Sequence, residues 1–464
     1  MTISEKIKGR KIGVIGIARS GVAAALLARR FGGVPFVTDT SPREKLATQI
    51  GRLNEAGIPF ETDGHTEQVL SSDYIVISPG VPLSAEIVKK VQKKNIPIFS
   101  ELEFASWVCR GKIIAVTGSN GKTTTTTLIG EILKAAGYNT YVCGNIGAPF
   151  AEIADQVGDN DYAVVEVSTF QLETIDQFCP DIALLLNLTP DHLDRHGTFE
   201  AYKELKFRIT ENQTADNLFI TNSDDPETKR SNIESDATCL QFSITSDPDQ
   251  DTMIINGQLS VKDKGSLVDI IPIEKIKILG QHNLQNAAVA ALAAIKAGVK
   301  PETIAQVLSE FPGVEHRLEM VGKIAGIRFI NDSKATNVES SAVAVRAMTG
   351  GVHIILGGLG KGAPYAPILE AGRDKILSMV LIGKAKDEIF AQLGKQFPSQ
   401  FAATLEEAVA ICFELARPGE TVLLSPACAS FDMFTSFEHR GEVFKAAVNA
   451  LKTGSPTNGT LSNS

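Results

Sequence analysis

A glycine-rich segment that ends in lysine and threonine occupies residues 112–127, KIIAVTGSNGKTTTTT. Gly118 and Gly121 lack a Cβ, so the backbone can curl around an anion and point its N–H groups inward. The pattern predicts a short strand, a tight turn and a helix that begins at Lys122, with its positive dipole end at the turn. Lys122 can neutralise outer phosphates, and the Thr123 hydroxyl can ligate magnesium. The segment predicts a nucleoside-triphosphate site.

The full phosphate-loop signature asks for a glycine five residues before Gly121, and Val116 occupies that position. The remaining pattern, G-x-x-G-K-T, is less specific when taken alone. The alternative is a threonine-rich helix start that binds no ligand. The apolar strand directly before the turn favours the phosphate site.

Two further candidates follow apolar strands. Glu166 lies in the otherwise apolar run 161–168, DYAVVEVS, where a buried carboxylate needs a cation or strong donors. Magnesium held opposite Thr123 would satisfy it, whereas an acid on an edge strand facing water would need nothing. His192 follows DIALLLNL in the polar run TPDHLDRH, at the sheet edge where ligands bind. It is a candidate metal or phosphate contact, with a lone surface histidine as the alternative.

Lys206 lies in a predicted helix over residues 199–209, four residues after Tyr202 and hence on the same face. On this pattern alone the lysine is unremarkable, because helix lysines are usually solvated. Asn283 and Asn286 lie near the start of the alanine-rich helix predicted over residues 280–294. They could cap that helix or read a purine edge, and the sequence favours capping.

The first forty residues alternate strand, glycine turn, helix and strand, and end in Asp39. This is the Rossmann order. The second glycine of the dinucleotide fingerprint is replaced by Ala18, so only Gly16 and Gly21 remain. The segment predicts a small α/β domain for a nucleotide-like ligand that is not a dinucleotide. Asp39 could bond a ribose, although such an acid is more often a helix cap.

The chain that must position these residues has 464 residues, which predicts two or three domains. Its net charge of −9 and lack of a basic run argue against a nucleic-acid partner. The six cysteines are scattered and indicate neither zinc nor a disulfide framework. No apolar run approaches the ~20 residues of a membrane span, and the N-terminus lacks a signal-like core. We expect a cytoplasmic protein without membrane insertion.

Strands and helices also alternate in the last third, where polar loops follow the strands: NDSKATN, GGLGKG and SPACASFDMF. Residues 215–278 are polar and predict short peripheral strands, and the tail from Thr453 predicts disorder. We therefore expect an α/β protein with three domains. The predicted boundaries are 1–101 for a Rossmann-like domain, 102–313 for a phosphate-loop domain with a parallel sheet, and 314–464 for a Rossmann-like C-terminal domain.

Seven motifs in this order resemble the Mur ligases of peptidoglycan synthesis: TGSNGKTTT, EVSTFQLE, NLTPDHLDRH, GQHNLQN, EHRLE, NDSKATN and SPACASFDMF. The resemblance spans nearly the whole chain. The DNPR-type motif of the ligases that add diaminopimelate or lysine is absent, and SPACASFDMF is similar to the branch that adds D-glutamate. One departure is Leu359 in GGLGKG, where some relatives carry an acid.

The resemblance implies an ATP-dependent, amide-forming ligase that adds D-glutamate to UDP-MurNAc-L-alanine through an acyl phosphate and releases ADP and phosphate. It implies magnesium, with two ions, and a carbamylated Lys206 that helps place the second ion. Three small-molecule partners follow, namely UDP-MurNAc-L-alanine, D-glutamate and ATP, and we expect a monomer.

The motifs also transfer site residues. The catalytic and metal set is Lys122, Thr123, Glu166, His192 and Lys206. The ATP set is Gly118, Ser119, Asn120, Gly121, Lys122, Thr123, Thr124, Asn286, Arg317, Asp332 and Lys334. The UDP-sugar set is Ser20, Asp39, Thr40, Gly80 and Asn145, and the D-glutamate set is Thr336, Lys361, Ser430 and Phe437.

Two other classes compete with this interpretation. A folate polyglutamate ligase would share the ATP chemistry but lacks the leading UDP domain. A nucleotide-binding module without catalysis would need no polar loops on three separate domains.

Overall fold

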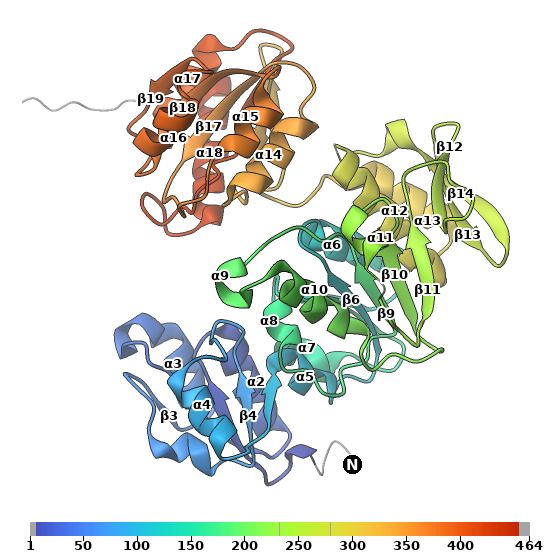
Figure 1. The fold of residues 1–464 in the computed structure, drawn as a ribbon, viewed down its shortest axis with the longest axis vertical. Helices are drawn as coiled ribbons and strands as arrows, with labels where there is room; N and C mark the ends of the chain where they lie inside the picture. Colours follow the sequence, from blue (N-terminus) through green and yellow to red (C-terminus); the bar gives the residue numbers. More distant parts are fainter. Residues whose placement is uncertain (1–5, 232, 279, 454–464) are drawn as a thin grey trace, which may run out of the picture. The chain divides into compact units, whose positions relative to one another are not determined.

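The computed structural model describes residues 6–231, 233–278 and 280–453, and the predicted disordered tail from Gly454 lies outside them. The chain divides into two compact units. The first comprises Met1–Ile276 with His282–Glu310, and the second comprises Lys277–Gln281 with Phe311–Ser464. Helices and strands alternate along the described chain (Figure 1), so the expected α/β class is confirmed.

The N-terminal sheet of the first unit has five parallel strands in the order β3-β2-β1-β4-β5. The strands are β1 Lys11–Ile15, β2 Val34–Thr38, β3 Phe60–Glu61, β4 Tyr74–Ile77 and β5 Ile98–Ser100. The helices are α2 Arg19–Arg30, α3 Ala47–Glu55 and α4 Glu86–Lys93, with 3₁₀ turns at η1 Arg43–Leu46 and η2 Glu67–Ser71. This strand order is Rossmann-like, as the sequence predicted.

The central sheet has six parallel strands in the order β11-β10-β9-β6-β8-β7. They are β6 Lys112–Thr117, β7 Thr140–Gly144, β8 Tyr162–Glu166, β9 Ile182–Leu185, β10 Leu218–Asn222 and β11 Thr238–Phe242. An antiparallel sheet of β12 Thr252–Ile255, β13 Gln258–Asp263 and β14 Ser266–Pro272 adjoins it in sequence. The polar segment 215–278 thus holds strands of two different sheets.

The remaining elements of this unit are helices and 3₁₀ turns. They are α5 Glu101–Ser106, α6 Lys122–Ala135, α7 Phe150–Ile153, η3 Ala154–Gln156, α8 Thr169–Leu172, α9 Leu193–His196, α10 Phe199–Phe207, η4 Arg208–Thr210, α11 Pro226–Arg230, η5 Ile273–Lys275, α12 Gln281–Lys296 and α13 Pro301–Glu310. Because α12 begins at Gln281, neither Asn283 nor Asn286 occupies its cap position, and the capping interpretation is wrong.

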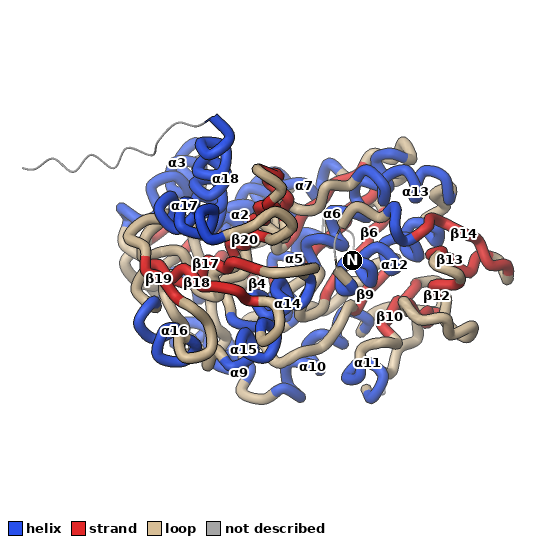
Figure 2. The backbone as a smooth tube through the Cα atoms, turned by 90° about the horizontal axis from the view of Figure 1, so that it is seen from above, coloured by secondary structure: helices blue, strands red, loops and turns tan. Residues whose placement is uncertain are grey.

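The second unit contains a six-stranded sheet in the order β15-β16-β20-β17-β18-β19, parallel except for β15. Its strands are β15 Glu319–Ile324, β16 Ile327–Asn331, β17 Val352–Gly357, β18 Ile376–Ile382, β19 Ser399–Phe401 and β20 Thr421–Leu424. Its helices are α14 Val338–Ala347, α15 Ala366–Gly372, α16 Lys386–Leu393, α17 Leu405–Leu415 and α18 Phe437–Thr453. Helices α15 and α16 lie on one face of this sheet and α17 and α18 on the other (Figure 2), each over its own apolar cluster.

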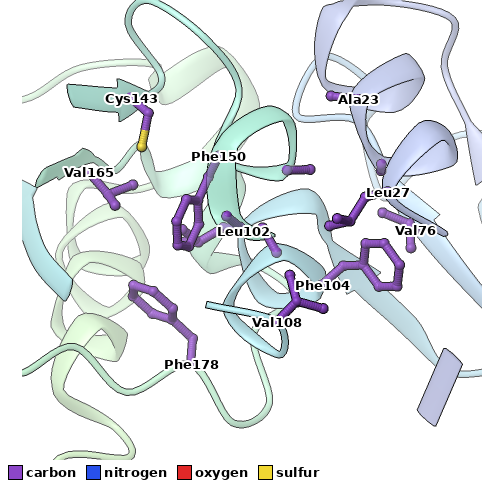
Figure 3. Close-up of a cluster of buried hydrophobic side chains, with 14 of the residues drawn as sticks. Ala23, Leu27, Val76, Leu102, Phe104, Val108, Cys143, Phe150, Val165 and Phe178 are labelled. Carbon is purple, nitrogen blue, oxygen red and sulfur yellow. The ribbon is translucent and has the colours of Figure 1, made fainter. Parts of the chain in front are cut away.

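One apolar cluster joins the N-terminal and central sheets within the first unit. Leu27 of α2, Leu102 and Phe104 of α5, and Phe150 of α7 belong to it, and all four are fully buried (Figure 3). A continuous core of this kind holds the two sheets as one body, because separating them would expose apolar surface to water. In the described part of the chain, no helix is long and apolar enough to cross a membrane.

One of the two glycines that remain from the nucleotide fingerprint, Gly21, supports a stability prediction. A Cβ added to Gly21 in α2 would lie 1.9 Å from the carbonyl oxygen of Gly16. We expect Gly21→Ala to destabilise the chain by about 3 kcal/mol, because helix and strand must separate to admit the methyl group. The midpoint of thermal unfolding measures this.

The matched control is Gly51→Ala, the same change in α3, where nothing lies within 4 Å of the added Cβ. We expect that variant to be stabilised by ~0.5 kcal/mol. Equal midpoints for the two variants would contradict the steric argument.

Candidate active site

The phosphate loop joins β6 to α6 and needs glycine at two places. Gly118 has φ +146° and Gly121 has φ +86°, a conformation that side chains disfavour. A Cβ at Gly121 would also lie 2.5 Å from Oδ1 of Asn286. No side chain caps α6 at Gly121, so the helix presents backbone N–H groups to the loop. The loop has the geometry of an anion site.

The loop after β9 holds the phosphate loop in this shape. Asn187 accepts from the backbone N–H of Asn120 at 2.8 Å and donates to its carbonyl at 3.0 Å. The Ser119 hydroxyl bonds the Thr189 carbonyl and the Tyr202 hydroxyl, each at 2.9 Å. These bonds fix Ser119 and Asn120 through the protein itself. The backbone N–H groups of both residues donate to Asn187, so the N–H groups that can face an anion are those at the start of α6.

Two lysines meet at the Gly118 carbonyl. Nζ of Lys122 donates to it at 2.8 Å and to the Ser119 carbonyl at 2.9 Å. Nζ of Lys206 donates to the same Gly118 oxygen, also at 2.8 Å, and lies 4.7 Å from the centre of the Tyr202 ring. Lys206 is 2% exposed, so the interpretation of a solvated helix lysine is wrong.

Burial lowers the pKa of Lys206 well below its ordinary value, and the charge of Lys122 lowers it further. Asp191 and Glu166 act in the opposite direction. The neutral amine is therefore far more available at Lys206 than on a solvated lysine.

Glu166 ends strand β8, which pairs with both β6 and β7, and it is 2% exposed. The alternative of an edge-strand acid facing water is wrong. Its Oε1 accepts from Nδ2 of Asn145 at 2.8 Å. Its Oε2 is buried and has no hydrogen-bond partner among the described residues. A buried, unpaired carboxylate oxygen suits a cation, which is what a magnesium ligand requires.

His192 precedes the short helix α9 and has φ +51°, and its side chain is half exposed. Its ring meets the Phe170 ring edge to face, with the ring centres 5.0 Å apart. Its neighbour on α9, His196, stacks on Phe170 and also contacts Tyr202. The aromatic contacts therefore connect His192 with the element that carries Lys206.

A cavity of about 210 Å³ lies between the N-terminal and central sheets. Three predicted UDP-sugar residues line it, namely Ser20, Gly80 and Asn145. Asn145 also bonds Glu166, so this cavity and the metal candidate share one residue. Gln171 of EVSTFQLE also lines this cavity and was not predicted. The available signal was a polar side chain between two apolar ones, Phe170 and Leu172.

Asp39 and Thr40 are not among the residues that line this cavity. The Asp39 carboxylate accepts from the backbone N–H groups of Ile17 at 2.6 Å and Ser41 at 2.7 Å. Burial acts to raise the pKa of Asp39, but these bonds outweigh it and the pKa is lowered. Asp39 fixes the glycine turn of the N-terminal sheet and caps no helix.

Asn286 belongs to the phosphate-loop environment. It is buried, accepts from the Thr125 hydroxyl at 3.2 Å and donates to Asn283 at 3.0 Å. Thr123 and Thr124 are buried in the first turn of α6 and directly precede Thr125, which makes this contact. Asn286 of α12 thus packs against α6, the helix that begins at Lys122.

In the second unit, the loop after β16 carries Asp332, Lys334 and Thr336. Asp332 accepts from the Ser425 hydroxyl at 2.7 Å and from the Leu318 backbone N–H at 3.2 Å. Burial raises the pKa of Asp332 to about 7, against the lowering by Ser425 and by Arg317. The Lys334 ammonium lies 5.8 Å from the ring centre of Phe437. Four predicted residues, Arg317, Asp332, Lys334 and Phe437, thus share one region.

The loops that carry Lys361 and Ser430 are joined by a bridge between Leu359 and Ala429. Ser430 is buried and Lys361 is exposed. The sequence analysis missed Arg440, which is fully buried and donates to the Ser333 hydroxyl and to the carbonyls of Ser333 and Cys428. Its guanidinium ties the loop after β16 to the loop after β20.

Comparison with known proteins agrees with this fold. Three family descriptions match in order: the MurD-like N-terminal domain over residues 10–100, the Mur ligase middle domain over 116–294 and the glutamate ligase domain over 316–428. A protein of Acidobacterium capsulatum named UDP-N-acetylmuramoylalanine–D-glutamate ligase is 42% identical over 96% of this chain and 97% of its own length. A Chloroherpeton thalassium protein of the same name is 40% identical over 96% and 99%.

Solved structures share the fold at low identity. MurF ligase of Thermotoga maritima, in complex with ADP, has a TM-score of 0.60 at 16% identity and covers 97% of both chains. UDP-N-acetylmuramate–alanine ligase MurC of the same organism has a TM-score of 0.59 at 18% identity and covers 96% of this chain and all of that one. The matched family models and the relatives at 40–42% identity identify an ATP-dependent, amide-forming ligase. The chain belongs to the Mur ligase family.

The position of Lys122 over the phosphate loop gives a catalytic prediction. We expect Lys122→Ala to lower the rate of ADP release by about 10³-fold, because one preorganised charge at the transferred phosphoryl group is lost. Lys134→Ala, on the exposed part of the same helix, is the matched control and should keep full activity. Folded Lys122→Ala protein with more than roughly a tenth of the normal turnover would contradict the assignment.

Proposed function

We propose that this chain joins D-glutamate to UDP-MurNAc-L-alanine in peptidoglycan precursor synthesis, with ATP as the energy source. The observation that carries the proposal is the contact between Asn145 and Glu166. It sets a cavity of the N-terminal side directly beside the phosphate-loop edge of the central sheet. An acceptor carboxylate bound in that cavity would meet the γ-phosphoryl group of ATP. The relatives at about 40% identity bear the name of this activity.

The first step activates the carboxylate. One oxygen of the L-alanine carboxylate attacks the γ-phosphorus of ATP, the bond to the β–γ bridging oxygen breaks, and ADP leaves. Lys122 and the backbone N–H groups at the start of α6 stabilise the charge on the phosphoryl group. The second step uses the acyl phosphate. The D-glutamate amine attacks the carbonyl carbon, and the tetrahedral intermediate expels inorganic phosphate to leave the amide.

Magnesium fits the residues present, because the buried Oε2 of Glu166 lacks a hydrogen-bond partner in the described chain. The residues that would hold two ions are Thr123, Glu166, His192 and the modified side chain of Lys206. Bound magnesium would neutralise phosphate charge during the transfer.

Lys206 has the environment that carbamylation requires. A lysine adds CO₂ only as the neutral amine: the amine nitrogen forms a bond to carbon, and one proton is released as the carbamate anion forms. Burial at 2% exposure favours the neutral amine and opposes hydration of the ammonium. The carbamate would place an anion beside the Lys122 ammonium, so the two side chains would attract each other.

The binding residues follow the motif assignments. ATP is proposed to contact Gly118–Thr124, Asn286, Arg317, Asp332 and Lys334. The UDP-sugar is proposed to contact Ser20, Gly80, Asn145, Asp39 and Thr40, the last two outside the 210 Å³ cavity. D-Glutamate is proposed to contact Thr336, Lys361, Ser430 and Phe437. A monomer in the cytoplasm, where ATP and nucleotide-linked precursors meet, completes the proposal.

ADP release tests the function directly. With UDP-MurNAc-L-alanine and ATP present, we expect release to depend on D-glutamate and not on L-glutamate, L-lysine or meso-diaminopimelate. Lys361→Ala should raise the KM for D-glutamate by about 10-fold or more and leave the KM for ATP unchanged, because one charge-assisted carboxylate contact is lost. Lys395→Ala, another exposed lysine of the same unit, is the control. Equal rates with the other amino acids would reject the proposed specificity.

Lys206→Ala tests the carbamate. We expect nearly complete loss of activity and partial rescue by added acetate or formate, whose carboxylate can replace the carbamate. Lys203→Ala on the same helix, where the lysine pairs with Glu227, should stay active and gain nothing from acetate. A fully active Lys206→Ala enzyme, or a metal-bound crystal structure with an unmodified amine turned to solvent, would reject carbamylation.

A further inference from the structure

Arg195 of α9 reaches from the loop that carries His192 to the N-terminal sheet. Its guanidinium donates to the carbonyl of Pro79 at 3.0 Å and to that of Val81 at 3.4 Å. These carbonyls flank Gly80 in the turn SPGVP, and Pro79 and Gly80 line the 210 Å³ cavity. The arginine thus bonds the backbone on both sides of a predicted UDP-sugar residue.

The guanidinium is fixed in place by two further contacts. Glu173 accepts from its Nε at 3.2 Å and from its Nη2 at 2.7 Å, a forked geometry that sets the plane of the group. The Phe170 ring lies under it, with the guanidinium carbon 4.1 Å from the ring centre. Only 18% of the Arg195 side chain and 10% of the Glu173 side chain are exposed. The arrangement is too enclosed for an ordinary surface ion pair.

The contacts of Arg195 also reach His192. Its ring packs on Phe170, the ring that supports the guanidinium, and its carbonyl accepts from the Arg195 backbone N–H at 3.0 Å. A displacement of the SPGVP turn moves the guanidinium, and the guanidinium moves Phe170 and the backbone that carries His192. Both ends of this chain of contacts lie in the same compact unit.

We propose that Arg195 is a positioning residue that couples occupancy of the UDP-sugar cavity to the placement of His192 for magnesium nucleotide. The inference rests on the proposed function of the cavity and of His192. Arg195 does not line the 210 Å³ cavity: it connects the turn beside that cavity with the ring on which His192 packs. Each ligand then tightens the binding of the other, because coupling between two sites is reciprocal.

Binding measurements on the full chain test this coupling. The dissociation constant of a non-hydrolysable ATP analogue with Mg²⁺ is measured by calorimetry, with and without saturating UDP-MurNAc-L-alanine. We expect the sugar nucleotide to tighten analogue binding about 5-fold or more in the wild-type chain, and this factor to fall to about 1 in Arg195→Ala. Glu173→Gln keeps the size of the side chain but loses the charged fork, so it should lower the factor as well.

The matched control is Arg30→Ala. Arg30 of α2 makes a similar fork with Asp155 at 2.7 and 3.0 Å and also reaches a backbone carbonyl, that of Ala151. It connects α2 with the segment around α7, and its hydrogen bonds within the described chain reach neither the SPGVP turn nor the His192 loop. We expect Arg30→Ala to keep the wild-type coupling factor. If coupling depended on the general contact between the two sheets, Arg30→Ala would lower the factor as well.

The outcomes separate the inference from the proposed function. A wild-type chain that does not bind UDP-MurNAc-L-alanine contradicts the proposed function. A wild-type chain that binds both ligands without coupling, or an Arg195→Ala variant that keeps the factor, overturns the inference alone. Loss of coupling in Arg30→Ala also overturns it, because the effect would then belong to the interface as a whole. If Arg195→Ala fails to fold, Glu173→Gln decides.

Discussion

A buried amine beside the phosphate loop is the constraint on which the central domain depends. Lys206 places its nitrogen 2.8 Å from the Gly118 carbonyl, to which Lys122 also donates, and water is excluded from the position. Burying a cation next to another cation is costly, and the lowered pKa of Lys206 is the consequence of that cost. The Gly118 carbonyl and the Tyr202 ring offset part of it. The same helix provides Tyr202, whose hydroxyl bonds Ser119 of the phosphate loop. The short helix α10 therefore sets both the shape of the loop and the chemical state of the amine.

The polar residues around this amine meet because the sheet is parallel. Strands β6, β8 and β9 are neighbours, so the phosphate loop, Glu166 and the loop before His192 all emerge at one edge. Hydrogen bonds between loops then replace the regular ladder: Asn187 bonds Asn120, and Asn145 bonds Glu166. Each of these hydrogen bonds pairs a polar side chain and also fixes the position of the residue that it contacts. The loops at this edge of the sheet are therefore held in a defined geometry. Oε2 of Glu166, which ends β8 at this edge, is one of the buried carboxylate oxygens that have no hydrogen-bond partner in the described chain.

The sequence predicted what local patterns control. The fold class, the strand-turn-helix at Lys122 and the central position of Glu166 depend on apolar runs, glycines and the cost of burying a charge. Other features depend on partners far away in sequence. Lys206 is buried by segments about ninety residues earlier, and Asn286 packs on a helix about 160 residues earlier. Arg440 was not predicted, because its acceptors lie in the loops after two other strands, far from it in sequence. Strands β15 and β19 were not predicted, because their residues are half-buried or exposed and form no continuous apolar run.

The loops of the two compact units are held in place by different side chains. In the first unit, the lysines lie on the phosphate-loop backbone and one of them is almost fully enclosed. In the second unit, a fully buried arginine organises the loops, while the lysine proposed for D-glutamate stays exposed on the GGLGKG loop. Arg440 is fully buried and donates to Ser333 and to Cys428, so its charge holds two loops together. The Arg440 guanidinium joins two loop backbones, and the bridge from Leu359 to Ala429 holds the loop that carries Lys361. The backbone of Lys361 is therefore fixed, while its exposed side chain can still change rotamer. Rigid loop backbones with a long cationic side chain at the rim suit a small dicarboxylate, because the cation can follow a carboxylate that the backbone has already oriented.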